Sequence, residues 1–146
     1  MSYPVLLTLH LFAALVFVGT VFFEVLMLEG LRGKVAAPAM REVERAIGNR
    51  ARSLMPWVLV VLYSAGIAMA WQYRAALAAP FASGFGLLLA LKILLAASVF
   101  VHFLAAMALM RSGRMRARHS RIIHLSVFCH VVTIVLLAKW MFYASW

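Results

Sequence analysis

Residues 85–110 read FGLLLALKILLAASVFVHFLAAMALM, an apolar run whose only charged or titratable side chains are those of Lys92 and His102. A helix needs about 20 predominantly apolar residues to cross the hydrocarbon layer of a bilayer. Three similar runs occupy residues 3–28, 54–71 and 122–143. None of the four alternates apolar and polar residues as the strands of a membrane barrel do. The pattern predicts four transmembrane helices.

The composition also indicates that the chain lies in a lipid bilayer. The chain has 146 residues, of which 66% are hydrophobic and 12% are charged, and its mean hydropathy is +1.00. A soluble domain is nearer half apolar and a quarter charged, so an ordinary soluble domain is excluded. The low polarity also excludes disorder. We therefore expect an all-α, integral-membrane four-helix bundle, with residues 1–146 forming a single transmembrane domain. The one cysteine, Cys129, allows no internal disulfide.

The charges are distributed unevenly. Lysine and arginine total 14, aspartate and glutamate total 4, and most of the basic residues lie in segments 29–53 and 111–121, the second of which includes Arg116. The positive-inside rule places both segments in the cytoplasm and both termini on the other side of a bacterial inner membrane. This arrangement explains the net charge without a nucleic-acid partner. Residues 38–52 are expected to form a short amphipathic helix on the cytoplasmic surface. Aromatic residues near the expected outer interface are Tyr3, Trp71, Tyr73, Trp140, Tyr143 and Trp146.

The candidate functional residues are six charged or histidine side chains inside the predicted spans: His10, Glu24, Lys92, His102, His130 and Lys139. An ionisable group at membrane depth is costly unless it is paired or bound, so each is a functional candidate. His102 precedes the inner end of its span by eight residues, and His130 follows the inner end of the next span by eight. At 1.5 Å per residue, both lie about 12 Å from the cytoplasmic boundary.

Two imidazoles at a similar depth on adjacent helices suit a b-type haem, whose iron accepts one nitrogen lone pair on each side. His102 and His130 are the predicted axial ligands. Bulky apolar residues near them, which suit a porphyrin slot, are Phe100, Phe103, Phe128 and Val131. His10 is an alternative ligand, or the ligand of a second haem. Lys92 and Lys139 are expected to hold haem propionates or another anionic substrate.

Structural roles compete with these functional ones. A membrane histidine often bonds only to a neighbouring backbone or hydroxyl group, and Ser98 and Ser126 precede His102 and His130 by four residues. Lys139 could extend its amine to the outer interface. Glu24 could pair with a loop arginine.

A family resemblance adds to these expectations. The segments TLHLFAALVFVGTVFFEVLMLE (8–29) and LALKILLAASVFVHF (89–103) resemble spans one and three of the HemJ and CopD-like membrane proteins. HemJ proteins are four-helix haem b proteins linked to protoporphyrinogen IX oxidation. The resemblance implies that His10 matches the family's first-span haem ligand, Lys92 its essential lysine and His102 its third-span histidine. The histidine-rich fourth span is closer to CopD-like proteins, which are often associated with copper resistance.

The leading prediction is a membrane b-type haem protein with a redox role. It would pass electrons from a quinol or porphyrinogen-like donor to an acceptor, with Lys92 and Glu24 as candidate catalytic residues. Three alternatives stay open: a HemJ-type protoporphyrinogen oxidase, a copper-binding or copper-transporting protein, and a non-redox assembly subunit. The expected partners are membrane lipid and a quinone or porphyrin-like molecule, and the sequence leaves a homodimer open.

Overall fold

The protein is all-helical in the computed structural model, which describes residues 2–115 and 117–143. No strand occurs among these residues, and four helices are long and apolar enough to cross a membrane. The prediction of an all-α, four-helix membrane fold is confirmed. Arg116 and Trp146, which the sequence assigns to the inner loop and the outer aromatic group, lie outside the described residues.

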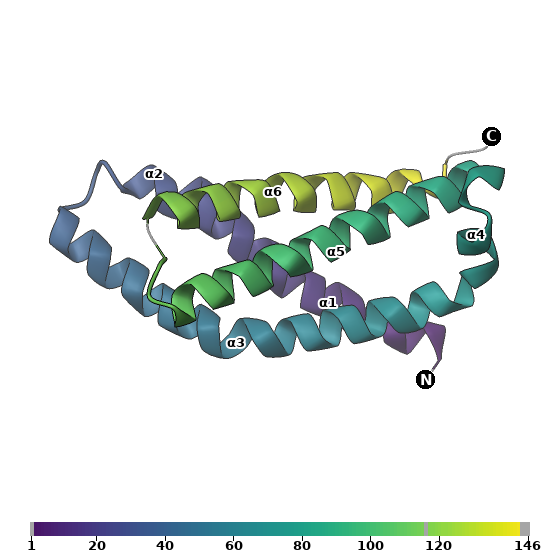
Figure 1. Cartoon of the computed structure of the whole chain (residues 1–146), viewed down its shortest axis with the longest axis horizontal. Helices are drawn as coiled ribbons and strands as arrows, with labels where there is room; N and C mark the ends of the chain where they lie inside the picture. The colour runs from purple at the N-terminus through teal and green to yellow at the C-terminus, as the bar shows by residue number, and fades with distance from the viewer. Residues whose placement is uncertain (1, 116, 144–146) are drawn as a thin grey trace. The chain divides into compact units, whose positions relative to one another are not determined.

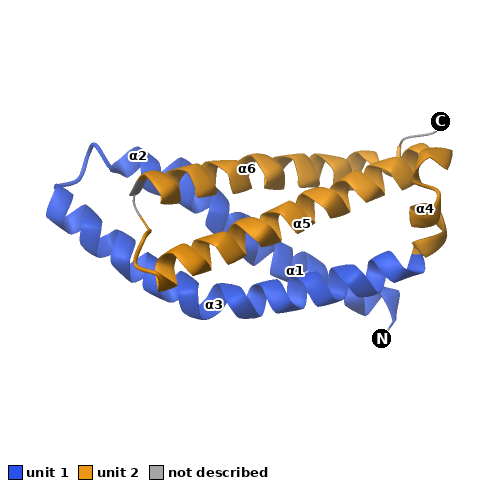
Figure 2. Cartoon of the chain, in the orientation of Figure 1, with its two compact units in different colours: residues 1–72 blue, residues 73–146 orange. Residues whose placement is uncertain are grey.

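The helices divide into two compact units, residues 1–72 and residues 73–146, which Figure 2 colours separately. Each unit contains two of the four long helices and is described by itself below.

The first unit is built from two helices that pack along each other. Helix α1 (Tyr3–Phe22) continues through a π-helical stretch, η1 (Phe23–Leu28), into the short α2 (Glu29–Leu31), and α1 packs against α3 (Ala37–Gln72). Small and apolar side chains form its buried core, among them Leu6, Ala13, Phe17, Leu59 and Ala65. The π-helical stretch contains Glu24, and such stretches are often found at functional sites.

The second unit pairs the long helices α5 (Gly84–Arg111) and α6 (Ala117–Trp140), which follow the short α4 (Arg74–Ala78) and the 3-10 turn η2 (Pro80–Ala82). Ser83 caps α5, because its side-chain oxygen accepts a hydrogen bond from the Gly86 amide at 3.1 Å. Gly86 packs closely on this turn: a Cβ there would lie 3.0 Å from the Ala76 carbonyl oxygen and 3.1 Å from that of Pro80, so a side chain would require the backbone to shift.

The outer surfaces of the long helices are apolar. Exposed fractions reach 66% for Phe12, 69% for Leu15, 68% for Ile67 and 67% for Leu94. Water would penalise so much contiguous apolar surface, whereas lipid chains would not. The chain is therefore a multi-pass membrane protein.

The second span departs from expectation. Residues 38–52 do not form a separate surface helix, because α3 runs without a break from Ala37 to Gln72. The segment is helical as expected, but it is part of α3 rather than a short separate helix, since the helix continues through Gly48 and Asn49. Pro56, which cannot donate a backbone hydrogen bond, lies inside the helix. Figure 1 shows α3 bending part-way along rather than ending.

The other spans lie near their expected positions. The first was expected at 3–28, where α1 and η1 lie, and the third at 85–110, where α5 lies. The fourth was expected at 122–143, whereas α6 begins earlier, at Ala117, and ends at Trp140.

Candidate functional site

His102 on α5 and His130 on α6 form the most distinctive polar cluster of the second unit. Their ring centroids are 5.3 Å apart and their planes are inclined by 55°. Both side chains are half-buried at the interface of the two helices. The structure thus brings together the two histidines that the sequence singled out as a pair.

Both imidazoles are anchored to their own helices in the same way. The Nδ1 atom of His102 lies 2.8 Å from the carbonyl oxygen of Ser98, and the Nδ1 atom of His130 lies 2.7 Å from the carbonyl oxygen of Ser126. Each partner is four residues earlier in the chain. Helical side chains lean toward the N-terminus of their helix, which brings each ring over this carbonyl.

The serine side chains complete a reciprocal exchange between the helices. The Ser98 hydroxyl lies 3.1 Å from Nε2 of His130, and the Ser126 hydroxyl lies 3.0 Å from Nε2 of His102. Each serine therefore serves one histidine through its carbonyl and the other through its hydroxyl. In an antiparallel pair, this register sets each imidazole opposite the other helix's serine.

These contacts determine the position of the protons in the neutral imidazoles. A carbonyl oxygen can only accept a hydrogen bond, so Nδ1 carries the proton in both rings. The lone pair then lies at Nε2 and accepts from a serine hydroxyl. Metal-binding histidines usually have this arrangement, in which a backbone carbonyl fixes the tautomer and the other nitrogen is the donor.

The two imidazoles carry the kind of nitrogen donor that a haem iron takes, but their rings are 5.3 Å apart centre to centre and each Nε2 faces a serine of the other helix. A porphyrin would therefore have to separate α5 from α6 at this point. Two neutral imidazoles with anchored Nδ1 atoms supply two nitrogen lone pairs, and the buried residues nearby are apolar, namely Val99, Val127 and Val131. The iron would have to replace both serine hydroxyls. Each such hydrogen bond contributes only about 0.5–1.5 kcal/mol net. The same two nitrogen donors also suit copper.

The first unit has a separate histidine site. The Nδ1 atom of His10 on α1 lies 2.9 Å from the carbonyl oxygen of Leu62 on α3. Gly66 follows Leu62 by one helical turn, and a Cβ there would lie 3.2 Å from Cε1 and 3.3 Å from Nδ1 of the ring. The glycine therefore lets the imidazole approach the α3 backbone. By the same logic of a carbonyl acceptor, Nδ1 of His10 carries the proton.

The remaining candidates are Glu24, in the first unit, and Lys92 and Lys139, which are each at least nine residues along the helix from the histidine of the same helix. Glu24 is half-buried in η1, and Lys92 is half-buried on α5. Lys139 is exposed in the last turn of α6, with its Nζ atom 5.3 Å from the centre of the Tyr143 ring. That cation–π contact agrees with a lysine directed toward an interface.

Sequence reasoning missed two features of these sites. It identified Ser98 and Ser126 only as neighbours of the histidine on the same helix, whereas their hydroxyls bond to the opposite helix. It also did not connect Gly66 with His10. The serine–histidine spacing is the same in both helices, SxxxH, and this was the signal that could have predicted the cross-helix bonds. In an antiparallel pair, the serine of each helix can lie opposite the histidine of the other.

No family model, curated protein or solved structure matches the chain.

Proposed function

We propose that this chain is an integral-membrane b-type haem protein with a redox role, and that His102 and His130 are the axial ligands. One observation carries the proposal: both Nδ1 atoms are held by backbone carbonyls, which leaves both Nε2 lone pairs at the helix interface. Haem, when bound, would supply an iron centre that accepts and releases one electron.

The protein's own groups would prepare and protect this site. The backbone carbonyls of Ser98 and Ser126 fix the two tautomers, and the serine hydroxyls bond to the Nε2 lone pairs that would hold the iron. The apolar interface of α5 and α6 would exclude water. His10 is proposed as the ligand of a second haem, because its Nδ1 is anchored in the same manner.

Substrate handling is assigned to the other membrane-depth groups. We propose that Lys92 binds an anionic group of a quinone or porphyrin-like substrate, with Lys139 acting nearer the interface. Glu24, in the π-helical stretch, is proposed to hold or move a proton. The basic segments then face the cytoplasm, in a bacterial inner membrane, by the positive-inside rule.

A visible spectrum of the detergent-purified chain, expressed with ample haem, tests the proposal. We expect reduced-minus-oxidised bands typical of haem b, with haem content confirmed as the pyridine haemochrome. His102→Ala and His130→Ala should each remove or shift the bands. His119→Ala is the matched control, because His119 is an exposed histidine at the start of α6.

Each other outcome has a definite meaning. If both substitutions leave the spectrum intact while His10→Ala abolishes it, the assigned ligands are wrong. A colourless protein that binds copper, and loses it in the same two variants, would support the copper alternative. A protein that converts protoporphyrinogen to protoporphyrin would be a HemJ-type enzyme. A chain that binds neither haem nor copper would be left with the role of an assembly subunit.

A further inference from the structure

The N-terminal part of α3 extends beyond what a bilayer requires. The helix has 36 residues, which at 1.5 Å per residue is about 54 Å, whereas the hydrocarbon layer is about 30 Å thick. Residues 56–72 would span about 25 Å of it. We call residues 37–55, which precede the proline, the α3 arm. The hydrocarbon layer therefore takes in only about three residues of the arm, next to Pro56, and the rest of the arm lies beyond it.

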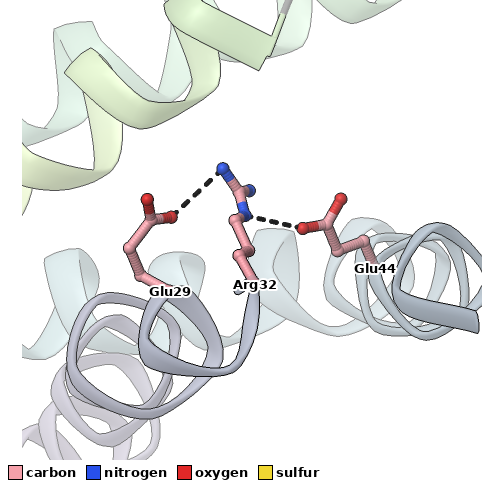
Figure 3. Close-up of polar contacts among 3 residues, drawn as sticks. All are labelled: Glu29, Arg32 and Glu44. Atoms are coloured by element: carbon pink, nitrogen blue, oxygen red, sulfur yellow. Dashed lines mark hydrogen bonds and ion pairs between the residues drawn. The ribbon is translucent and has the colours of Figure 1, made fainter. Parts of the chain in front are cut away.

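Arg32 pairs with a carboxylate of the arm. It lies 3.1 Å from a carboxylate oxygen of Glu29 and 2.8 Å from one of Glu44, so one guanidinium holds two carboxylates (Figure 3). Glu44 belongs to the arm and Glu29 to α2. The ion pairs thus connect the arm to α2 and remove Glu44 as a partner for the arginines of the arm.

Three arginines of the arm share one helix face. With 100° per residue, Arg45 lies about 40° and Arg52 about 20° around the helix from Arg41. All three are exposed, and within the described residues no ion pair joins them to a carboxylate. Arg52 also bonds to Asn49. We call Arg41, Arg45 and Arg52 the arginine face.

Other charges of this region do not belong to the face. Arg50 lies about 180° from Arg41, on the opposite side of the helix. Glu42, the remaining carboxylate of the arm, lies about 100° from Arg41. Lys34 precedes the helix altogether.

We propose that the arginine face binds the phosphodiester headgroups of anionic phospholipids in the surrounding bilayer. Arg41 and Arg45 are one turn apart, with Cβ atoms about 6 Å from each other, so both guanidiniums can reach one phosphate. Arg45 and Arg41 lie about 16–23 Å along the helix from Pro56, whereas the headgroup layer on each side is about 5–8 Å thick. They reach the headgroups when the arm leans toward the bilayer from the bend in α3 (Figure 1). Charge complementarity therefore favours a lipid headgroup as the occupant.

The test measures lipid binding to the full-length chain in detergent by native mass spectrometry. Phosphatidylglycerol is titrated against the wild type and two double variants, Arg41→Gln/Arg45→Gln and Lys34→Gln/Arg50→Gln. Both variants lose the same net charge. A basic residue near an anionic surface contributes a factor of about 5 to binding. We expect the first variant to bind at least about fivefold more weakly, and the control to change less than twofold.

Further arms of the experiment identify the ligand. Phosphatidylcholine should bind without discrimination between the variants, and inorganic phosphate should not displace phosphatidylglycerol. Arg41→Lys/Arg45→Lys, which keeps the charge, should retain most of the binding and so guards against a folding defect. Equal weakening in both glutamine variants, or no weakening in either, would overturn the proposal. Displacement by inorganic phosphate would show a free-anion site instead. None of these readouts depends on haem.

Discussion

Replacing Ser98 with alanine separates the two roles of the reciprocal histidine–serine exchange. The substitution removes the hydroxyl 3.1 Å from Nε2 of His130 but keeps the backbone carbonyl that accepts from His102. One cross-helix hydrogen bond is therefore lost and the tautomer of His102 is unaffected. Hydrogen bonds between membrane helices average about 0.6 kcal/mol and reach about 1.7 kcal/mol, so Ser98→Ala should destabilise the chain by that amount.

The same substitution should strengthen haem binding if His130 is an axial ligand. Iron has to displace the serine from Nε2, and in the variant this hydrogen bond is already absent. Haem binding to the variant no longer has to break that hydrogen bond, so its dissociation constant for haem should be about 3-fold to 18-fold lower than that of the wild type. Ser126→Ala should behave likewise through His102, because its bond is of similar length, 3.0 Å.

Two assays on the same preparations measure these effects. Reversible unfolding in mixed detergent gives the change in stability, and titration of the apoprotein with haemin, followed at the Soret band, gives the affinity. Ser64→Ala is the matched control, because its hydroxyl bonds only within α3, to the Val61 carbonyl. A Ser98→Ala protein as stable as Ser64→Ala would refute the cross-helix bond. A less stable protein with weaker haem binding would refute the role of the serine as a displaceable partner.

Further substitutions test the packing and the ion pairs. Gly86→Ala should lower the free energy of unfolding by about 1–3 kcal/mol, because its Cβ would meet backbone carbonyls at 3.0 and 3.1 Å. Gly66→Ala should lower the free energy of unfolding by a similar amount, because its Cβ would displace the His10 ring. Gly48→Ala is the control: nothing lies within 4 Å of its Cβ, so it should raise the free energy of unfolding by up to about 1 kcal/mol. Equal changes in the two variants, measured by chemical unfolding, would contradict this account. Arg32→Gln should lower stability by less than about 1 kcal/mol, and by less still at high salt, because its ion pairs are partly exposed. A large decrease in the free energy of unfolding that does not change with salt would show that the ion pairs of Arg32 stabilise the fold more than their exposure predicts.

The four apolar runs made the fold class predictable, because a bilayer admits few structures other than closed barrels and helices. The continuity of α3 was not predictable in the same way. The segment around Arg41 and Arg45 is polar enough to be taken for a loop or surface helix, yet it contains good helix formers and no terminating turn. Pro56 removes one backbone hydrogen bond inside the helix without ending it, as prolines do in membrane helices.

The candidate site was only partly within reach of sequence reasoning. The depths of His102 and His130 follow from counting residues, so their proximity could be predicted. The serine partners depend on the register between two antiparallel helices, which residue counting fixes no better than to within a turn. The hydrogen bond of His10 to the Leu62 carbonyl requires that no side chain of α3 block the ring. Gly66 provides that space, and its position relative to the ring cannot be counted from the sequence.

The spin state of ferric haem in the purified chain tests the assignment of His102 and His130 most directly. Electron paramagnetic resonance should give a low-spin signal typical of two imidazole ligands in the wild type and in His119→Ala. Removing either proposed ligand should convert the signal to high spin or abolish haem binding. A low-spin bis-imidazole signal that survives in both His102→Ala and His130→Ala, or a wild type that takes up no haem, would contradict the assignment.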